Sequence, residues 1–436
     1  MMNNSLSKDA SLNLNLTGKL LSYLKTSEPY WLASEHPVGM YLVQDPEVIT
    51  TPVNKPAIQG VFAFQVDSET INLTVPVLYK STDPVRGEVY RPVEITPPVS
   101  LSFDQPVLLF PDAAAREIQL TIRNLVREKV FGKIQLNAPA GWRVSPAEID
   151  LKLASRDDLQ RLAVTITPSG TSGSARLSAR FLMDDEIIQT GIENIDYQHI
   201  PTQTLQPPAS LRLVRSEVII AGNEVGYIAG AGDEIPAALK SIGYHVTELN
   251  TAQLNESTLA QFDAIVLGVR ALNVNRGLKT TMPMLLRYAE KGGTVIVQYN
   301  TNFELVAEPF SPFELGLSRD RVTEEDSEVE IRLPVHPALK FPNKISMADF
   351  SDWVQERGLY FPNKWDTHFQ APLAMRDRGE SMKEGALLVA SVGSGYFVYT
   401  GLSFFRQLPE GVPGAYRLLA NLVSLGSKSN KKSGRK

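Results

Sequence analysis

Three short polar residues, Asn300 to Asn302, end the uncharged run Thr294 to Tyr299. Such a run is typical of a strand that is buried on both faces of a parallel sheet. In open α/β sheets, ligands bind outside the carboxyl ends of the strands. We therefore expect a small-molecule site here, with Gln298, Asn300 and Asn302 among its ligand groups.

The densest polar and aromatic stretch is ADFSDWVQERGLYFPNKWD, residues 348–366. Carboxylates beside tryptophans suit a sugar, because aromatic faces stack on C–H surfaces while carboxylates and amides hold hydroxyls. Paired acids also suit general acid–base catalysis. This stretch supplies Asp349 and Asp352 as candidate catalytic acids, and Trp353 and Arg357 as candidate ligand groups. An ion-paired segment whose tryptophans anchor a loop remains the structural alternative.

Three further candidates come from other segments. His336, in LPVHPALK, lies in a loop between two prolines and is the candidate catalytic histidine. Arg270 follows the predicted strand Ala264 to Val269, and Arg406 lies in GLSFFRQLPEG after the last predicted strand. Both arginines are candidate ligand groups, because they follow strands that end at the same edge of the predicted sheet.

Several common chemistries are excluded by residue type. The chain has no cysteine, so thiol nucleophiles, disulfides and cysteine-ligated zinc are absent. It also has no G-x-x-x-x-G-K-[ST] and no H-E-x-x-H. The run GAGDEI lacks the third glycine of a dinucleotide fingerprint, and Asp233 would place a carboxylate against a pyrophosphate. The five histidines form no ligand pair, so we expect neither a metal nor a cofactor.

Length and charge limit the remaining classes. The chain has 436 residues, enough for about three domains. Its net charge of −5 does not indicate a general nucleic-acid-binding surface, which would be basic. No apolar run is long enough to span a membrane, and the start lacks the pattern of a signal peptide. The basic block from Ser427 to Lys436 has no apolar residue and is predicted to be a disordered tail.

The first half of the chain is predicted to be β-sandwich. Apolar residues alternate with period two from Ala57 to Glu186, in short runs separated by turn signals. We expect a first sandwich over residues 57–97 and an Ig-like sandwich over 98–200, in which Trp142 plugs the core. Residues 1–56 are predicted to hold a helix at Leu16 to Leu24 and an extended segment.

The second half is predicted to be an α/β domain. Residues 201–212 are rich in proline and are predicted to be a linker. From 213 to 426, strand and helix patterns alternate in a βαβαβ order, which predicts a doubly wound sheet. A hairpin from Ala386 to Thr400 and a helix from Val412 to Leu425 are expected to close it.

These stretches also carry a family resemblance. GAGDEIPAALKSIGYHV, VLGVRALN, GGTVIVQYNTN, DFSDWVQERGLYFP and TGLSFFRQLPEGVPGAYRL together resemble the C-terminal region of large bacterial PIG-L (LmbE-type) deacetylases. The stretches PYWLASEHPVGMY and VLYKSTDPVRGEVYRPVEITPPV resemble its connecting region, and APAGWRVSP resembles Ig-like modules associated with carbohydrate-binding domains. The resemblance covers about Pro29 to Leu425. It implies Ig-like modules followed by a class I glutamine-amidotransferase-like, ThuA-like domain of flavodoxin-like fold.

Two departures separate the chain from that family's enzymes. The zinc motif His-Pro-Asp-Asp is missing, because neither His36-Pro37 nor His336-Pro337 is followed by two aspartates. The amidotransferase nucleophile is a cysteine after the strand that matches Val295 to Tyr299, and Asn300 and Thr301 stand there instead. The resemblance therefore implies neither deacetylation nor glutamine hydrolysis by these residues, and whether the chain is an enzyme stays open.

The resemblance and the residues together imply a non-catalytic, carbohydrate-associated accessory region of a PIG-L deacetylase. It would bind a glycan or glycoconjugate at the strand ends of the α/β domain. One alternative is a ThuA-like sugar-processing enzyme that uses Asp349, Asp352 or His336 as acid and base. Another is a scaffold that docks a deacetylase domain. The parent family suggests a periplasmic or extracellular location, but the chain itself leaves the compartment open.

Overall fold

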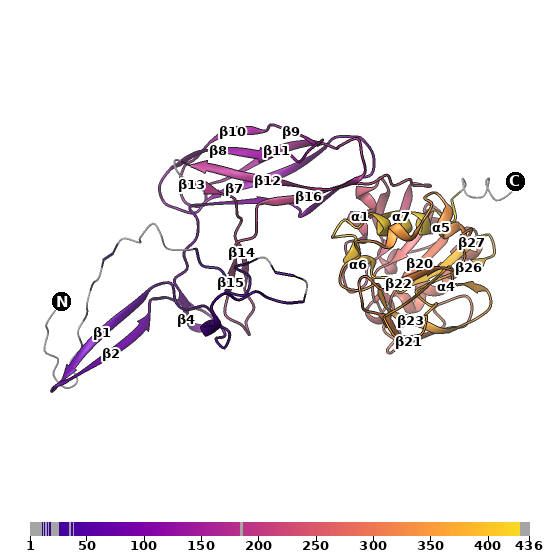
Figure 1. Cartoon of the computed structure of the whole chain (residues 1–436). Coiled ribbons are helices and arrows are strands. Elements are labelled where there is room, and N and C mark those ends of the chain that lie inside the picture. Colours follow the sequence, from indigo (N-terminus) through magenta and orange to yellow (C-terminus); the bar gives the residue numbers. More distant parts are fainter. Residues whose placement is uncertain are drawn as a thin grey trace.

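Three parts follow one another along the chain, with the sandwich between the N-terminal hairpins and the C-terminal domain (Figure 1). The computed structural model describes residues 11, 13, 15, 17–18, 26–34, 36–37, 39–183 and 186–427. Apart from Thr17 and Gly18, the helix predicted at Leu16 to Leu24 lies outside the described residues. The same holds for the predicted tail beyond Ser427.

The expected first sandwich over residues 57–97 is wrong. This region contains two separate antiparallel hairpins, and within the described part of the chain neither shares a sheet with any further strand. A short 3₁₀ turn precedes them at Pro46–Val48. Their strands are β1 (Gln59–Val66), β2 (Glu69–Pro76), β3 (Leu78–Asp83) and β4 (Gly87–Pro92). The period-two pattern predicts strands correctly here, but it does not tell whether a second layer covers them.

The Ig-like β-sandwich is confirmed. Apolar residues alternate along each strand, so β7 (Arg116–Asn124) buries Ile118, Leu120 and Ile122 on one face. One sheet has the order β5 (Val99–Phe103), β7, β11 (Leu159–Thr167), β9 (Arg143–Ser145). The other has the order β10 (Glu148–Leu153), β8 (Val130–Asn137), β12 (Gly173–Met183), β16 (Ser210–Arg215), β6 (Val107–Phe110), with β13 (Glu186–Ile188) on β12.

The predicted linker over residues 201–212 is largely strand. A small hairpin of β14 (Glu193–Ile195) and β15 (Gln203–Leu205) occupies its start. Strand β16 then completes the sandwich by pairing with β12 and, in parallel, with β6. The prolines at 201 and 207–208 flank these strands rather than forming a flexible connection.

A seven-stranded mixed sheet organises the C-terminal domain. Its order is β18 (His245–Glu248), β17 (Glu224–Ile228), β19 (Ala264–Leu267), β20 (Thr294–Gln298), β27 (Gly395–Thr400), β26 (Leu387–Val392), β24 (Phe369–Gln370). The first five strands run parallel, and the last two are antiparallel to their neighbours. The predicted buried strand is β20, whose five residues are all buried, and the predicted hairpin is β26–β27.

Helices cover both faces of this sheet. Alternate residues of β20 enter different cores, since Ile296 packs with α1 (Ile235–Ser241) and α7 (Pro413–Ser424), whereas Val295 packs with α4 (Leu278–Glu290). Helix α7 is the predicted closing helix. The remaining helices are one turn or little more: η2 (Thr251–Gln253), α2 (Glu256–Leu259), α3 (Ala271–Val274), α5 (Pro337–Lys340), η3 (Met347–Phe350) and α6 (Phe404–Gln407).

The expected doubly wound, flavodoxin-like α/β domain is wrong. Strands make up 39% of the described residues and helices 14%, so the described structure is mostly β. After β20 the chain does not continue with alternating strands and helices. It forms two separate antiparallel pairs, β21 (Leu315–Val322) with β23 (Gly358–Trp365) and β22 (Glu328–Ile331) with β25 (Leu373–Arg376). These pairs and antiparallel β26 take the place of further βα units.

The sandwich and the C-terminal domain are in direct contact. Arg212 Nη1 donates to the carbonyl of Glu410 at 2.8 Å, and Arg116 Nη2 donates to the carbonyl of Ser241 at 2.8 Å. A groove of about 440 Å³ lies between them, lined by Val107 on one side and Tyr416 on the other. Among the described residues, none of the helices has the length and apolar character that crossing a bilayer requires.

The sandwich core provides the first testable expectation. Trp142 is 7% exposed, and its ring meets Phe110 edge-on with centroids 5.1 Å apart, as the prediction of a core plug requires. Trp142→Ala should lower the free energy of unfolding by about 3–5 kcal/mol, because it opens a cavity in the core. Phe131→Ala, at an exposed ring of the same sandwich, is the control. Equal midpoints for both variants in urea unfolding would contradict the core role.

Candidate functional site

The carboxylate of Asp233 holds together the carboxyl ends of the central strands. Its Oδ1 accepts from the hydroxyl of Tyr227 at 2.8 Å and from the backbone N–H of Ile235 at 3.1 Å. Its Oδ2 accepts from the backbone N–H of Val269 at 2.8 Å and from Nε2 of Gln298 at 3.2 Å. One side chain therefore links β17, the start of α1, the end of β19 and β20.

Asn300, the first polar residue after β20, is used by the fold. Its Oδ1 accepts from the backbone N–H of Leu272 at 2.8 Å, and its Nδ2 donates to the carbonyl of Gln298 at 2.8 Å. Its own N–H donates to the hydroxyl of Tyr399 at 3.2 Å. Asn300 is fully buried, so this expected ligand group instead ties the turn after β20 to the start of α3.

Three aromatic rings gather beside that turn. The ring of Tyr299 lies parallel to that of Tyr360, with centroids 6.1 Å apart, and 5.3 Å from that of Phe405. Burial raises the pKa of the Tyr299 hydroxyl, while the positive charges of Arg270 and Arg406 act in the opposite sense. Two of the predicted ligand groups thus flank an aromatic surface that comes from β20, β23 and α6.

The charged members of the group are held by neighbours. The guanidinium of Arg406 lies 4.9 Å from the Phe405 ring centroid, and its Nε donates to Oε1 of Glu356 at 2.6 Å. Its Nη1 also donates to Oε1 of Gln355. Arg270 is held through its backbone N–H, which donates to the carbonyl of Tyr299 at 2.8 Å. The Nε of Arg270 is buried and has no hydrogen-bond partner.

Three non-glycine residues of this group have left-handed backbone conformations. Arg270 has φ of 56°, Gln355 of 65° and Tyr360 of 52°. Each such non-glycine residue costs on the order of 1 kcal/mol or more, and such residues persist where the surrounding structure dictates them, often at binding sites. We call the whole group the strand-end cluster: Arg270, Tyr299, Gln355, Tyr360, Phe405 and Arg406.

Two predicted ligand groups are corrected, because they belong to the core. Trp353 is 3% exposed, its Nε1 donates to the carbonyl of Asp349 at 3.0 Å, and it packs against Phe350. Arg357 is also buried and donates from Nη2 to the carbonyl of Ser327 at 3.0 Å. Burial lowers the pKa of Arg357. Since Trp353 and Asn300 are both buried, they do not line a shared binding surface as expected.

The candidate acids Asp349 and Asp352 and the remaining ligand group, Asn302, have different surroundings. The carboxylate of Asp349 pairs with Nε of Arg417 at 2.7 Å and caps η3 by accepting from the N–H of Ser346 at 2.8 Å. Asp352 is exposed and has φ of 59°. Asn302 is exposed in the loop after β20. The structure therefore assembles no acid pair from Asp349 and Asp352, because the first is held by Arg417.

His336 caps a helix. Its Nδ1 accepts from the backbone N–H of Ala338 at 3.1 Å, at the start of α5. Burial lowers the pKa of this imidazole, while a hydrogen bond with Gln370 acts in the opposite sense. The ring is therefore held in its neutral form as a structural acceptor. Among the described residues, no group of three or more side chains is placed to hold a metal ion.

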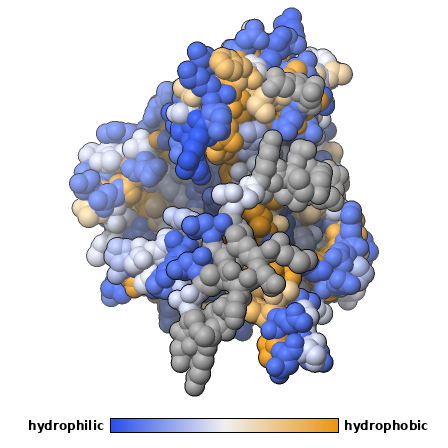
Figure 2. Space-filling view, turned by 90° about the vertical axis from the view of Figure 1, so that its left-hand side faces the viewer, coloured by the Kyte–Doolittle hydropathy of each residue, from blue (hydrophilic) through white to orange (hydrophobic). Residues whose placement is uncertain are grey.

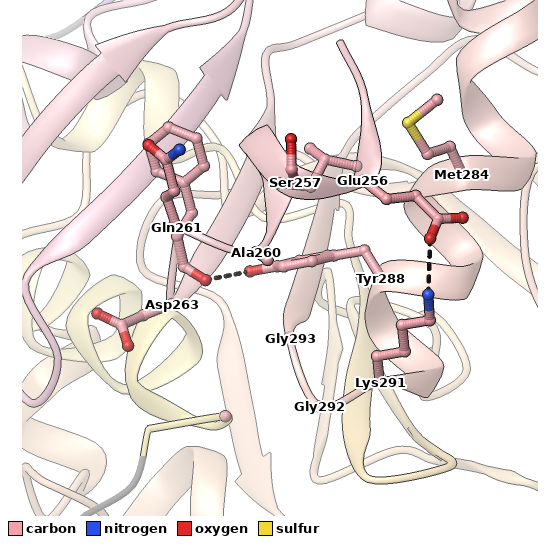
Figure 3. A pocket seen from close by; sticks show the side chains of 13 residues that line it. Glu256, Ser257, Ala260, Gln261, Asp263, Met284, Tyr288, Lys291, Gly292 and Gly293 are labelled. Atoms are coloured by element: carbon pink, nitrogen blue, oxygen red, sulfur yellow. Dashed lines mark hydrogen bonds and ion pairs between the residues drawn. The ribbon is translucent and has the colours of Figure 1, made fainter.

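A cavity of about 560 Å³ opens at the opposite, amino-terminal edge of β19 and β20 (Figure 3). Its charged side chains already have partners. Glu256 pairs with Lys291 at 2.7 Å, and Asp263 accepts from the backbone N–H of Asn223 at 2.8 Å. The hydroxyl of Tyr288 donates to the carbonyl of Phe262 at 2.9 Å. This cavity therefore offers no charged group without a partner, unlike the strand-end cluster.

Sequence reasoning missed part of the cluster. The sequence predicts Tyr299 as the last residue of a strand and does not single out Phe405, which stands between Phe404 and Arg406. Tyr360 and Gln355 lie in the polar and aromatic stretch that the sequence singled out, but were not chosen from it. The signal that could identify Tyr299 and Phe405 is aromatic character in the segments that follow the ends of β20 and β27.

Comparison with known proteins adds little. No family model and no curated protein matches the chain. Among solved structures, SSP-19, an MSP-domain-like protein of Caenorhabditis elegans, is 16% identical over 26% of this chain and 98% of that one, with a TM-score of 0.17. The apo Calx CBD1 domain is 10% identical over 27% of this chain and 97% of that one, at 0.18.

A larger part of the chain is similar to the exo-β-1,4-mannosidase Op5Man5 of Opitutaceae bacterium strain TAV5. That similarity has 12% identity, covers 47% of this chain and 35% of that one, and has a TM-score of 0.28. This chain thus spans about a third of the mannosidase. At such scores, none of these similarities supports an argument about function.

The role of Asp233 can be tested by a change of a single atom. In Asp233→Asn, the new NH₂ must face one of the N–H or O–H donors that the carboxylate now accepts from. We expect the free energy of unfolding to fall by about 2–4 kcal/mol. Glu234→Gln, at the exposed neighbour, is the matched control. Equal stability of the two variants in denaturant titrations would show that the carboxylate does not hold the strand ends.

The buried His336 predicts a dependence of stability on pH. Its pKa is lowered on folding from an ordinary value of 6.5, so protonation favours the unfolded chain. The stability it contributes is present above pH 6.5 and is lost as the pH falls below that value. His336→Asn keeps a capping acceptor without titrating, so its free energy of unfolding should fall less than that of the wild type in this window. Curves of unfolding free energy against pH that run parallel for the wild type and His336→Asn would contradict this prediction. His199→Asn, at an exposed ring, is the control.

Proposed function

We propose that the chain is a carbohydrate-binding accessory module, which holds a sugar or glycoconjugate at the strand-end cluster without transforming it. One observation supports this most: aromatic rings, arginines and an amide converge at the carboxyl ends of β20 and β27 on a strained backbone. Tyr360, Phe405 and Arg406 are all partly exposed there, so a ligand can reach them.

The chemistry of the cluster suits a sugar. An aromatic face stacks on the C–H side of a pyranose, and the planar fork of an arginine donates to neighbouring hydroxyls. The Arg406 guanidinium is fixed by Glu356 and Gln355 before any ligand arrives. Groups held in place in this way lose little freedom on binding, which favours affinity.

Binding without turnover fits the positions of the acids. Asp349 is paired with Arg417, and His336 caps α5. Neither is among the residues of the strand-end cluster. The proposed relation to PIG-L deacetylases, and a deacetylase domain as partner, remain predictions that rest on the sequence resemblance.

Calorimetry tests the proposal. A panel of neutral, amino and uronic-acid oligosaccharides is titrated into the full chain, and at least one is expected to bind. Phe405→Ala should weaken that binding by about 1–3 kcal/mol, because it removes one wall of the aromatic surface.

Phe131→Ala is the matched control, since Phe131 is also an accessible ring beneath a cation, with Lys152 Nζ 5.5 Å from its centroid on the sandwich. Both variants should keep the wild-type unfolding midpoint. An absence of heat with every oligosaccharide, or equal losses in the two variants, would overturn the proposal.

A further inference from the structure

The two N-terminal hairpins expose an unusual amount of apolar surface. Their large exposed side chains include Phe64, Val66, Ile71, Leu73, Leu78 and Tyr79. Figure 2 views this end of the molecule and shows orange, apolar patches among the blue. No described residue before Val99 belongs to any of the three hydrophobic cores. A two-stranded hairpin without a covered face is at best marginally stable in water, so something must cover these hairpins.

Most of the large apolar residues of β1–β2 lie on one face. The register sets Phe62 opposite Leu73 and Phe64 opposite Ile71, and paired residues share a face. The rings of Phe62 and Phe64 stack with centroids 6.5 Å apart. The intervening positions point to the other face and are mostly small or polar, with Val61 as the one large apolar side chain among them. Most of the hairpin's apolar area therefore lies on one side, as in a sheet that packs on another layer.

Electrostatics narrow the choice of partner. Three of the four Lys and Arg side chains in residues 49–97 are already in ion pairs. Lys55 pairs with Glu47 at 3.0 Å, Lys80 with Glu88 at 2.5 Å and Arg91 with Asp196 at 3.1 Å. The apolar face carries a carboxylate only near its tip, at Glu69. A partner that fits this face is apolar and uncharged, and the same face of a second copy meets that requirement.

We propose that the β1–β2 hairpin is the interface of a homodimer, in which its apolar face packs on the same face of a second copy around a two-fold axis. The face presents six large apolar side chains, from Phe62 to Val75. At roughly 60–120 Å² each they remove on the order of 400–700 Å² per subunit from water, slightly below the ~800 Å² per partner of a standard interface. The dimer should therefore be weak.

Sedimentation velocity of the full chain tests this over the micromolar concentration range. The expected result is a shift with concentration from 48.1 kDa towards twice that mass. Ile71→Glu, on the apolar face, should remain monomeric at every concentration. Asn72→Glu adds the same charge to the adjacent position on the other face and should dimerise as the wild type does. Unfolding midpoints show that both variants are folded.

Any of four results would overturn the proposal. A wild-type chain that is monomeric at all concentrations has no such dimer, and a dimer that survives Ile71→Glu uses another surface. A monomer whose β1–β2 backbone amides resist hydrogen exchange has its face covered by its own chain. A monomeric wild type that binds an added PIG-L deacetylase domain through this face would show that a different protein is the partner.

Discussion

The carboxylate of Asp233 is the constraint on which the C-terminal domain depends. It accepts four hydrogen bonds, from Tyr227, Ile235, Val269 and Gln298, and so ties three parallel strands and a helix start at one point. The turns that follow these strands then have little freedom. Arg270 is forced into a left-handed conformation one residue after Val269, and Tyr299 follows Gln298. A single half-buried acceptor thus holds the strand ends after which the arginine and the first aromatic ring of the strand-end cluster follow.

Much of the fold could be predicted from the sequence where the periodicity is strong. The sandwich strands, the buried strand β20, the β26–β27 hairpin and helix α7 all have clear patterns, and the structure contains them. The doubly wound α/β domain was a wrong prediction, because the βαβ pattern before Asn302 was extended beyond it. The segments after Asn302 form short antiparallel pairs, and local pattern does not reveal which strands will pair. The linker prediction was wrong for a related reason, since β16 joins the sandwich by pairing with β12 and β6, and the local pattern does not reveal these partners.

The candidate site was predicted in part. Its location at the strand ends follows from the general rule for parallel strands, and Arg270 and Arg406 lie there. The sequence could not distinguish Trp353 as a core residue from Trp353 as a sugar platform, because both roles use the same side chain beside the same acids. Burial decided it. Tyr299 and Phe405 escaped notice for the converse reason, since an aromatic residue at a strand end resembles ordinary core until its neighbours are known.

Hydrogen exchange of the full chain, with and without the oligosaccharide that binds it best, tests the central claim most directly. The account predicts slower exchange in peptides from 268–276, 298–302 and 354–361, which carry most of the strand-end cluster, and unchanged exchange at 256–263 and 291–293. Protection confined to the latter peptides would place the ligand in the cavity at the opposite edge of the sheet and would contradict the account.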